Sequence, residues 1–122
     1  NNTGKPLIVH CVRAYEEILQ LLVKLKNRQP VIFHGYNKNW HTAERILGAG
    51  HWLSFGKALE QLQVQQVFFQ TPVDRFFLET DDSDLDIEII YGLAADIKSM
   101  PMNELLMQLE MNFEKLFKIP LR

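Results

Sequence analysis

The apolar residues near the start of the chain recur at helical spacing. Because residues three or four positions apart line one side of an α-helix, the spacing predicts a helix over residues 6–27, with Pro6 in its first turn and Pro30 beyond its end. The apolar run Leu7-Ile8-Val9 also fits a short buried strand, so helix and strand stay open for residues 6–12. The apolar stripe consists of Ile8, Cys11, Tyr15, Ile18, Leu22 and Leu25.

The middle of the chain alternates short apolar stretches with turn residues. Residues 31–33 are β-branched or aromatic and predict a strand or a buried extended segment. Asn39 or Thr42 can cap a short helix that follows, and Gly48 ends it. A further helix is predicted over residues 53–62.

From Val64 onward the pattern changes to the period of two that is typical of strands. Residues 67–71 and 74–79 predict two strands, and the alternation over residues 87–91 predicts a third. The connections between them are short, and the second is a polar turn at residues 81–84. Strands joined by short turns are antiparallel neighbours, so we expect a three-stranded antiparallel β-meander.

The end of the chain predicts an amphipathic helix. Ser99 can cap it and Pro101 suits its first turn. Its apolar face consists of Leu105, Leu109, Phe113 and Leu116. Four methionines on the same segment suggest packing on a second copy, as a homodimer through the C-terminal helix: Met100, Met102, Met107 and Met111.

Together these elements predict one α+β domain over residues 1–122. It has a helical N-terminal part, the antiparallel meander and the C-terminal amphipathic helix. A length of 122 residues suits one domain, and 47% hydrophobic with 23% charged residues is a globular composition that excludes a disordered tail.

Compartment and redox chemistry follow from what the sequence lacks. No apolar run approaches the ~20 residues of a membrane span, and the first residues show no secretory signal. We therefore expect a cytoplasmic protein without a membrane partner. Cys11 is the one cysteine, so it cannot form an internal disulfide, and its apolar neighbours predict an inert buried thiol.

The charges are distributed unevenly. The net charge is −2, yet residues 74–96 contain eight acidic side chains and one basic side chain, Arg75. On the predicted strands these carboxylates can share one face and attract a basic surface. The function predicted from them is a non-enzymatic, acidic protein-binding module, in its most concrete form an immunity protein that neutralises a basic toxin such as a nuclease domain. The partner-binding residues would be Asp74, Glu79, Asp81, Asp82, Asp84, Asp86 and Glu88.

The same acidic segment has other interpretations. A run of charges is often only a solvated loop, and a secretion or assembly chaperone would carry a similar surface. Asp82, Asp84 and Asp86 match the opening of a calcium loop, but Ile87 stands where glycine is needed and Leu93 where glutamate is needed. We therefore expect no metal and no cofactor.

The histidines support the alternative function, a small hydrolase that depends on histidine and glutamate, with or without a metal. His41 and Glu44 share one face of a predicted helix, and His34 and His51 lie within ten residues of His41 on either side. The pattern departs from H-E-x-x-H, and no G-x-S-x-G motif or phosphate-binding loop is present. We therefore expect no catalytic residues.

Nucleic acid is also not expected as a partner. The acidic segment and the net charge of −2 disfavour it. A positively charged N-terminal part with Tyr36, Trp40 and Trp52 leaves nucleic-acid binding as a minor option.

Overall fold

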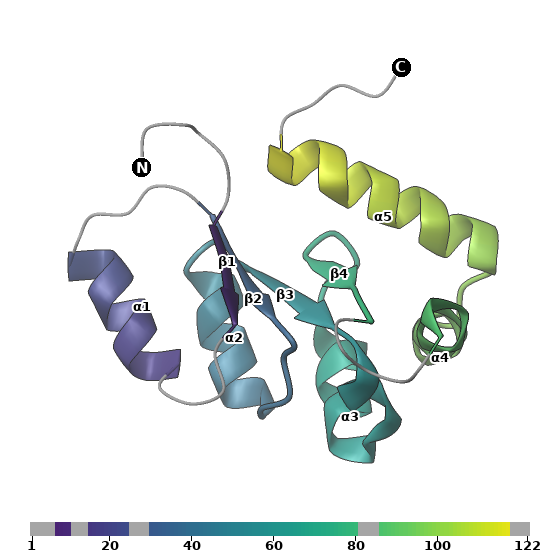
Figure 1. Cartoon of the computed structure of the whole chain (residues 1–122), viewed down its shortest axis with the longest axis horizontal. Coiled ribbons are helices and arrows are strands. Elements are labelled where there is room, and N and C mark those ends of the chain that lie inside the picture. The colour runs from purple at the N-terminus through teal and green to yellow at the C-terminus, as the bar shows by residue number, and fades with distance from the viewer. Residues whose placement is uncertain (1–6, 11–14, 25–29, 81–85, 118–122) are drawn as a thin grey trace.

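The structure is a computed structural model in which residues 7–10, 15–24, 30–80 and 86–117 are described. Helices and strands alternate along the first two thirds of the chain, and two helices follow (Figure 1). The elements are β1 (Leu7–His10), α1 (Tyr15–Lys24), β2 (Val31–His34), α2 (Trp40–Gly48), β3 (Trp52–Phe55), the 3-10 helix η1 (Lys57–Glu60), α3 (Leu62–Gln70), β4 (Phe76–Leu78), α4 (Ile87–Lys98) and α5 (Met102–Phe117).

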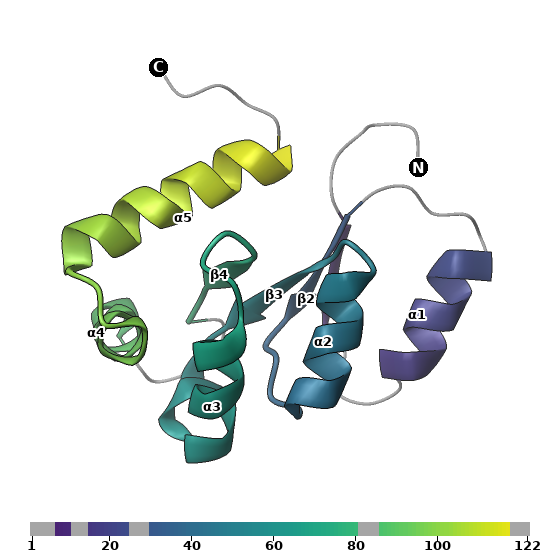
Figure 2. The same ribbon diagram turned by 180° about the vertical axis from the view of Figure 1, so that it is seen from behind.

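The strands form one parallel sheet in the order β1-β2-β3-β4. Between successive strands, a helical connection brings the chain back to the edge of the sheet at which the previous strand began. The next strand therefore runs in the same direction, as parallel pairing requires. Helices α1, α2 and α3 lie on one side of the sheet and α5 lies on the other (Figures 1 and 2). The predicted antiparallel meander is therefore wrong, because helices separate the strands where short turns were expected.

The main core lies between the sheet and the helices α1 to α4. Alternate residues along β2, β3 and β4 point to it, among them Phe33, Phe55 and Phe76, all fully buried. The ring of Phe68 from α3 packs edge-to-face on Phe55 and Phe76, with centroids 5.0 and 4.6 Å apart. These aromatic pairs hold α3 against β3, which precedes it in the chain, and β4, which follows it.

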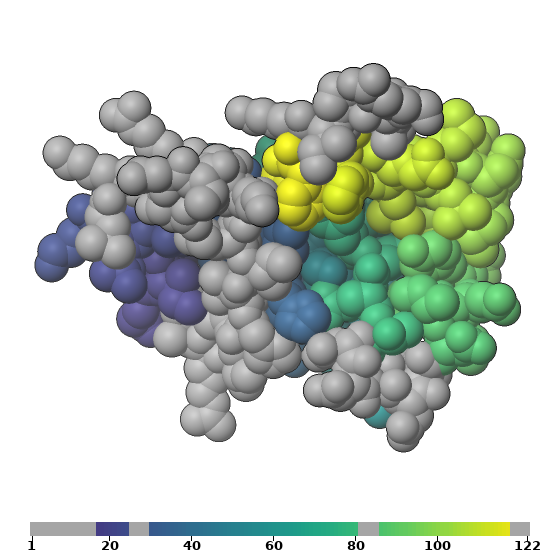
Figure 3. Space-filling view, turned by 45° about the horizontal axis from the view of Figure 1, so that its top comes forward, coloured from purple at the N-terminus to yellow at the C-terminus, as the bar shows by residue number. Residues whose placement is uncertain are grey.

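The opposite face of the sheet has its own smaller apolar cluster. Ile32 and Trp52 are buried there against Leu116 of α5, with Phe77 and Phe117 packed around them. Trp52 stacks on Phe77 at a centroid distance of 5.3 Å. Figure 3 shows the yellow end of α5 lying over the blue and teal residues of the sheet. Both faces of β3 are thus covered, which explains why all four of its residues are buried.

A buried amide joins α5 to the sheet. The Asn112 side-chain nitrogen donates to the backbone oxygens of Val73 and Phe76, both at 2.9 Å. The amide oxygen of Asn112 accepts from Gln108 at 2.9 Å. Asn112 therefore satisfies the carbonyl group of Phe76 in β4 and that of Val73 in the segment that precedes this strand.

A lysine joins α4 to the end of α3. The Lys98 amine donates to the backbone oxygens of Phe69, at 3.0 Å, and Thr71. It also lies 5.0 Å from the centre of the Phe68 ring. Burial lowers the pKa of Lys98 to about 8. The amine thus donates to carbonyl groups at the C-terminal end of α3, where the last carbonyls have no partner within the helix.

Several predicted elements are corrected. The segment predicted as one helix over residues 6–27 contains β1 and α1, so the strand alternative was the right one for Leu7-Ile8-Val9. The helix predicted over residues 53–62 is instead most of β3 followed by η1. The predicted strands at 67–71 and 87–91 lie mostly in α3 and in α4.

The physical reason for the last error is an ambiguous period. Ile87, Ile90 and Ala94 recur at spacings of three and four, and the last two are fully buried. Over only five residues this helical spacing cannot be told from alternation. Ser99 also has a different role, because it ends α4 in the left-handed conformation with φ 52° and does not cap α5.

Other predicted elements agree with the structure. Strand β2 occupies the predicted segment 31–33, and α2 begins at the predicted cap Asn39, whose side chain accepts from the Thr42 backbone nitrogen at 2.9 Å. The C-terminal amphipathic helix is α5. Met102, Met107 and Met111 are exposed on α5, and the homodimer expected through them stays a prediction.

Replacing Asn112 by Ala should lower the free energy of unfolding by about 1–3 kcal/mol, because a buried and a partly buried carbonyl group lose their donor. Urea denaturation measures this loss. Asn103→Ala is the matched control, since Asn103 is exposed on the same helix, and it should change stability by less than about 0.5 kcal/mol. Equal stability of the two variants would contradict the role of the buried amide.

Candidate functional site

The carboxyl ends of the parallel strands bring titratable side chains to one edge of the sheet. Strand β1 ends at His10 and β2 at His34, and these two residues are register partners. Glu79 directly follows β4, and its backbone nitrogen donates to the Phe55 oxygen at 2.9 Å, which extends the β3–β4 pairing by one residue. Ligands of parallel α/β sheets bind at this edge, so it is the candidate functional site.

His34 and Glu79 form the central contact of the site. The Nδ1 atom of His34 lies 2.8 Å from Oε2 of Glu79, and the side chains are 22% and 13% exposed. The other carboxylate oxygen, Oε1, accepts from the Gly35 backbone nitrogen at 3.3 Å. Gly35 has φ 66°, a left-handed conformation that suits glycine. The carboxylate therefore holds both the imidazole ring and the backbone turn that follows it.

This contact determines the state of the His34 ring. A ring whose Nδ1–H donates to a carboxylate carries its lone pair on Nε2 when it is neutral. Nε2 can then accept a proton or bind a metal ion. Metal-binding histidines commonly donate their other ring N–H to a carboxylate, so the geometry suits either chemistry.

The site has an apolar floor. His34, Ser54 and Glu79 lie on the face of the sheet opposite the main core, because side chains alternate along each strand. The same face carries Phe77, the register partner of Ser54, and Trp52, which lies one layer nearer the amino ends; these two rings are the stacked pair of the smaller cluster. The polar groups of the site thus lie beside packed aromatic rings that hold the strands in place.

Comparison with known proteins identifies the family. A family model described as TatD related DNase matches residues 1–118. The chain belongs to the TatD related DNase family. No curated protein matched the sequence.

Two solved structures of TatD proteins have the same fold. One is YJJV, a TatD homologue from Escherichia coli K12, with a TM-score of 0.84 and 21% identity over 94% of this chain and 51% of that chain. The other is a hydrolase of the TatD family from Entamoeba histolytica, with a TM-score of 0.82 and 17% identity over 92% of this chain and 50% of that chain. The chain spans about half the length of each.

Family membership corrects the predicted function. The expectation of a non-enzymatic immunity protein or toxin inhibitor is wrong, because the matching family is one of DNases and one similar structure is a hydrolase. The alternative interpretation, a hydrolase, agrees with these findings; its dependence on histidine and glutamate stays a prediction. Expectations about a protein partner and the cytoplasm stay predictions; in the described part of the chain no helix is long and apolar enough to cross a membrane.

The four candidates for that alternative do not converge. His41 and Glu44 are exposed on α2. His51 lies at the amino end of β3, where its Nδ1 accepts from the Val31 backbone nitrogen at 3.0 Å. His34 is the one candidate at the carboxyl edge, where Glu79 replaces the expected Glu44. Among the side chains that the structure describes, no group of three or more His, Cys, Asp or Glu could hold a metal ion.

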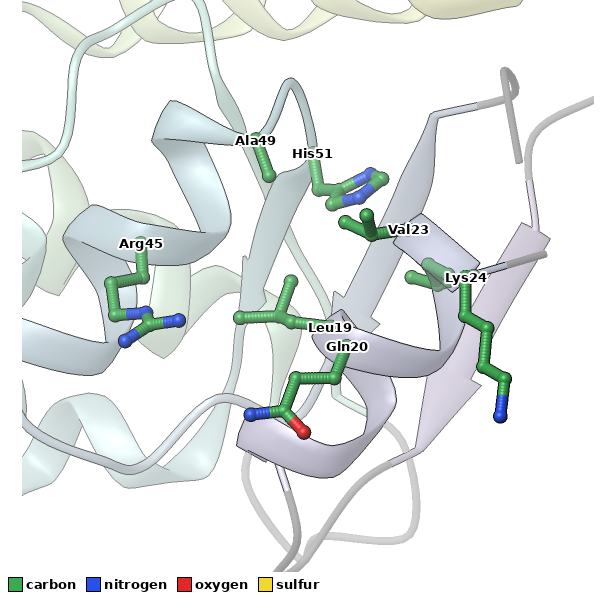
Figure 4. A pocket seen from close by; sticks show the side chains of 8 residues that line it. Leu19, Gln20, Val23, Lys24, Arg45, Ala49 and His51 are labelled. Atoms are coloured by element: carbon green, nitrogen blue, oxygen red, sulfur yellow. The ribbon is translucent and has the colours of Figure 1, made fainter. Parts of the chain in front are cut away.

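His51 borders a different cavity, of about 400 Å³, between α1 and α2 (Figure 4). Leu19 and Val23 line it from α1, and Lys24 points away from His51 and Arg45. Burial, and then the charge of Arg75, lower the pKa of His51. A neutral His51 is what the Val31 hydrogen bond requires, so its role is structural.

The predicted acidic surface is not a single strand face. Asp74 pairs with Lys115 of α5 at 3.2 Å, and Glu79 lies in the candidate site. Asp86 and Glu88 are exposed at the start of α4. Asp81, Asp82 and Asp84 lie outside the described residues. The acidic side chains do not share one strand face because residues 87–91 are helical. Binding of a basic partner by these acids stays a prediction.

The sequence did contain a signal for the site that was missed. Leu7-Ile8-Val9 precedes His10, and Val31-Ile32-Phe33 precedes His34. In each case a short apolar strand ends at a histidine, which is typical of functional residues at the carboxyl edge of a parallel sheet. Glu79 follows the apolar end of β4 in the same way.

The lowered pKa of His51 predicts a pH dependence of stability. The unfolded chain takes up a proton near pH 6.5 that the folded chain resists. The stabilising contribution of neutral His51 to the folded state is therefore fully present above pH 6.5, and it is lost as the pH falls from there through the lowered pKa of the folded state. In urea denaturation from pH 7 to pH 5, the free energy of unfolding should fall more steeply for the wild type than for His51→Gln, which keeps an acceptor. His41→Gln, at an exposed position, should follow the wild type, and identical curves for all three would contradict the assignment.

Proposed function

We propose that the chain acts as a hydrolase of phosphodiester bonds in DNA, with the His34–Glu79 pair at its reaction centre. The observation that carries the proposal is the 2.8 Å contact between His34 and Glu79 at the carboxyl edge of the sheet, in a chain of the TatD related DNase family. A buried carboxylate that orients an imidazole is a recurrent arrangement for moving a proton.

Each residue has a defined task in this proposal. Hydrolysis forms a bond from a water oxygen to phosphorus and breaks the P–O bond to the leaving oxygen, which takes up a proton from solvent; the attacking water loses a proton in the same step. Nε2 of His34 accepts that proton, and the Glu79 carboxylate stabilises the positive ring that results. The second hydrogen bond, from the Gly35 nitrogen to Oε1, keeps the carboxylate from rotating away from the ring.

The same donors fit a divalent cation. Nε2 of His34 would be a nitrogen ligand, and the end of β1, which pairs with His34 through His10, lies at the same edge of the sheet. A cation held there would supply a bound water of lowered pKa and polarise a phosphoryl oxygen. Glu79 keeps its task in this case, since it orients the His34 ring.

Two lysines suit the phosphate backbone. Lys38 lies in the loop after β2, and Lys57 begins η1 directly after β3. The loop after β2 and the start of η1 both lie at the carboxyl edge of the sheet, as do His34 and Glu79. Lysine contacts to phosphate supply most of the sequence-independent affinity for DNA. The proposal departs from the expectation that nucleic acid is not a partner, which was based on the acidic segment and the net charge of the chain.

Truncating the pair should abolish or strongly reduce cleavage. His34→Ala should lower kcat on a DNA substrate by about 100-fold or more. Glu79→Ala should lower it by ~10–100-fold, the usual loss when a carboxylate that orients such a histidine is removed. The measurement is steady-state cleavage of labelled DNA by the full chain, with and without a chelator.

Two exposed residues provide matched controls. His41→Ala on α2 and Glu110→Ala on α5 should retain wild-type activity. If a chelator abolishes cleavage and added Mg²⁺ or Mn²⁺ restores it, Nε2 binds a cation. If cleavage persists in the chelator, Nε2 acts in proton transfer. Wild-type cleavage by His34→Ala, or no cleavage by the unmodified chain, would contradict the proposal.

Lys57 should contribute to DNA affinity through charge alone. Lys57→Ala should weaken binding similarly for all sequences and reduce the slope of log K against log salt by about 1. Fluorescence anisotropy at several salt concentrations measures this slope. Lys24→Ala, in the last turn of α1 near the amino ends of the strands, should leave the slope unchanged; equal effects of the two variants would place the DNA elsewhere.

A further inference from the structure

Glu79 reaches His34 across an intervening strand. The sheet order places β3 between β2 and β4, and adjacent strands are about 4.8 Å apart. Glu79 follows β4 and His34 ends β2, yet their side-chain atoms meet at 2.8 Å. The Glu79 side chain must therefore pass over β3 or the residue that follows it.

The residue at the crossing point is Gly56. Phe55 is the register partner of Leu78, so the next pair along the ladder is Gly56 and Glu79. A Cβ atom built on Gly56 would lie 2.7 Å from the Glu79 carbonyl oxygen and 3.1 Å from its Cγ. The first distance is too short for any Cβ, and the neighbour is backbone, which cannot move aside without breaking the pairing of β3 with β4.

The surroundings of Gly56 differ from those of Gly48 and Gly92, which lie in helices. A Cβ on Gly48 or Gly92 would meet nothing within 4 Å. Glu79 therefore occupies the space that a side chain at position 56 would need. The backbone φ of Gly56 is −139°, so close approach and not a left-handed conformation is the reason for glycine here.

We infer that Gly56 is a positioning residue: its missing side chain opens the path by which Glu79 spans β3 and holds both the His34 Nδ1 and the Gly35 nitrogen. A methyl group at this position displaces Glu79 and separates its carboxylate from the ring. His34 then loses the partner that keeps the proton on Nδ1. The consequence for catalysis rests on the proposed function, whereas the consequence for the His34 ring does not.

The first test reads the ring directly. Long-range ¹H–¹⁵N spectra of the neutral protein should show His34 protonated on Nδ1 in the wild type and mainly on Nε2 in Gly56→Ala. Gly92→Ala is the matched control and should keep the wild-type pattern. A folded Gly56→Ala protein with an unchanged His34 pattern would overturn the inference.

A double-mutant cycle separates positioning from general damage. Gly56→Ala should change the His34 pattern in the wild-type background and add no further change in Glu79→Ala, because the carboxylate of Glu79 is already absent there. An equal change in both backgrounds would show that Gly56 acts without Glu79 and would overturn the inference.

A second variant serves if Gly56→Ala does not fold. Glu79→Asp shortens the side chain by one methylene and leaves Gly56 unchanged, so its carboxylate should fail to span β3 and His34 should lose the Nδ1–H pattern. Retention of the wild-type pattern would overturn the inference. In the cleavage assay Gly56→Ala should lower kcat by about tenfold or more with little change in KM. A changed ring pattern with unchanged cleavage would support the inference and contradict the proposed function.

Discussion

The carboxylate of Glu79 is the point on which the candidate site depends. One oxygen contacts the imidazole of His34 and the other accepts from the backbone of Gly35. An acceptor shared in this way fixes the ring and the turn at the end of β2 together. Because Glu79 is largely shielded from water, leaving either donor without it would be more unfavourable than at the surface.

The parallel register makes this contact possible, and the packing on both faces of the sheet maintains the register. On one face the rings of Phe55, Phe68 and Phe76 interlock. On the other, Trp52 and Phe77 stack beside the polar groups of the site. A shift of β4 by one residue would exchange these faces and move Glu79 away from His34. The aromatic core therefore sets the geometry of the site, although none of its rings belongs to it.

Sequence patterns could predict the elements that have a single plausible period or a clear cap. Strand β2, helix α2 with its Asn39 cap and helix α5 are of this kind. Helix α4 was missed because Ile87, Ile89 and Tyr91 alternate while Ile87, Ile90 and Ala94 follow a helix. Interpreting the residues of α3 and α4 as strands predicts an antiparallel meander, and in that sheet His34 and Glu79 could not meet. The pair is a consequence of tertiary pairing, and no local pattern contains it.

The acidic segment shows why a sum of charges is a weak guide to function. Residues 74–96 carry eight acids, but Asp74 is paired with Lys115 and Glu79 contacts His34, so these two carboxylates do not act as an outward field. A carboxylate that holds an imidazole contributes to chemistry through direction and distance, and its charge is largely compensated when the ring is positive. Whether Nε2 of His34 accepts a proton or holds a cation, the ring must keep its proton on Nδ1. Both chemistries therefore impose the same requirement on Glu79, and through Glu79 on the space left open at Gly56.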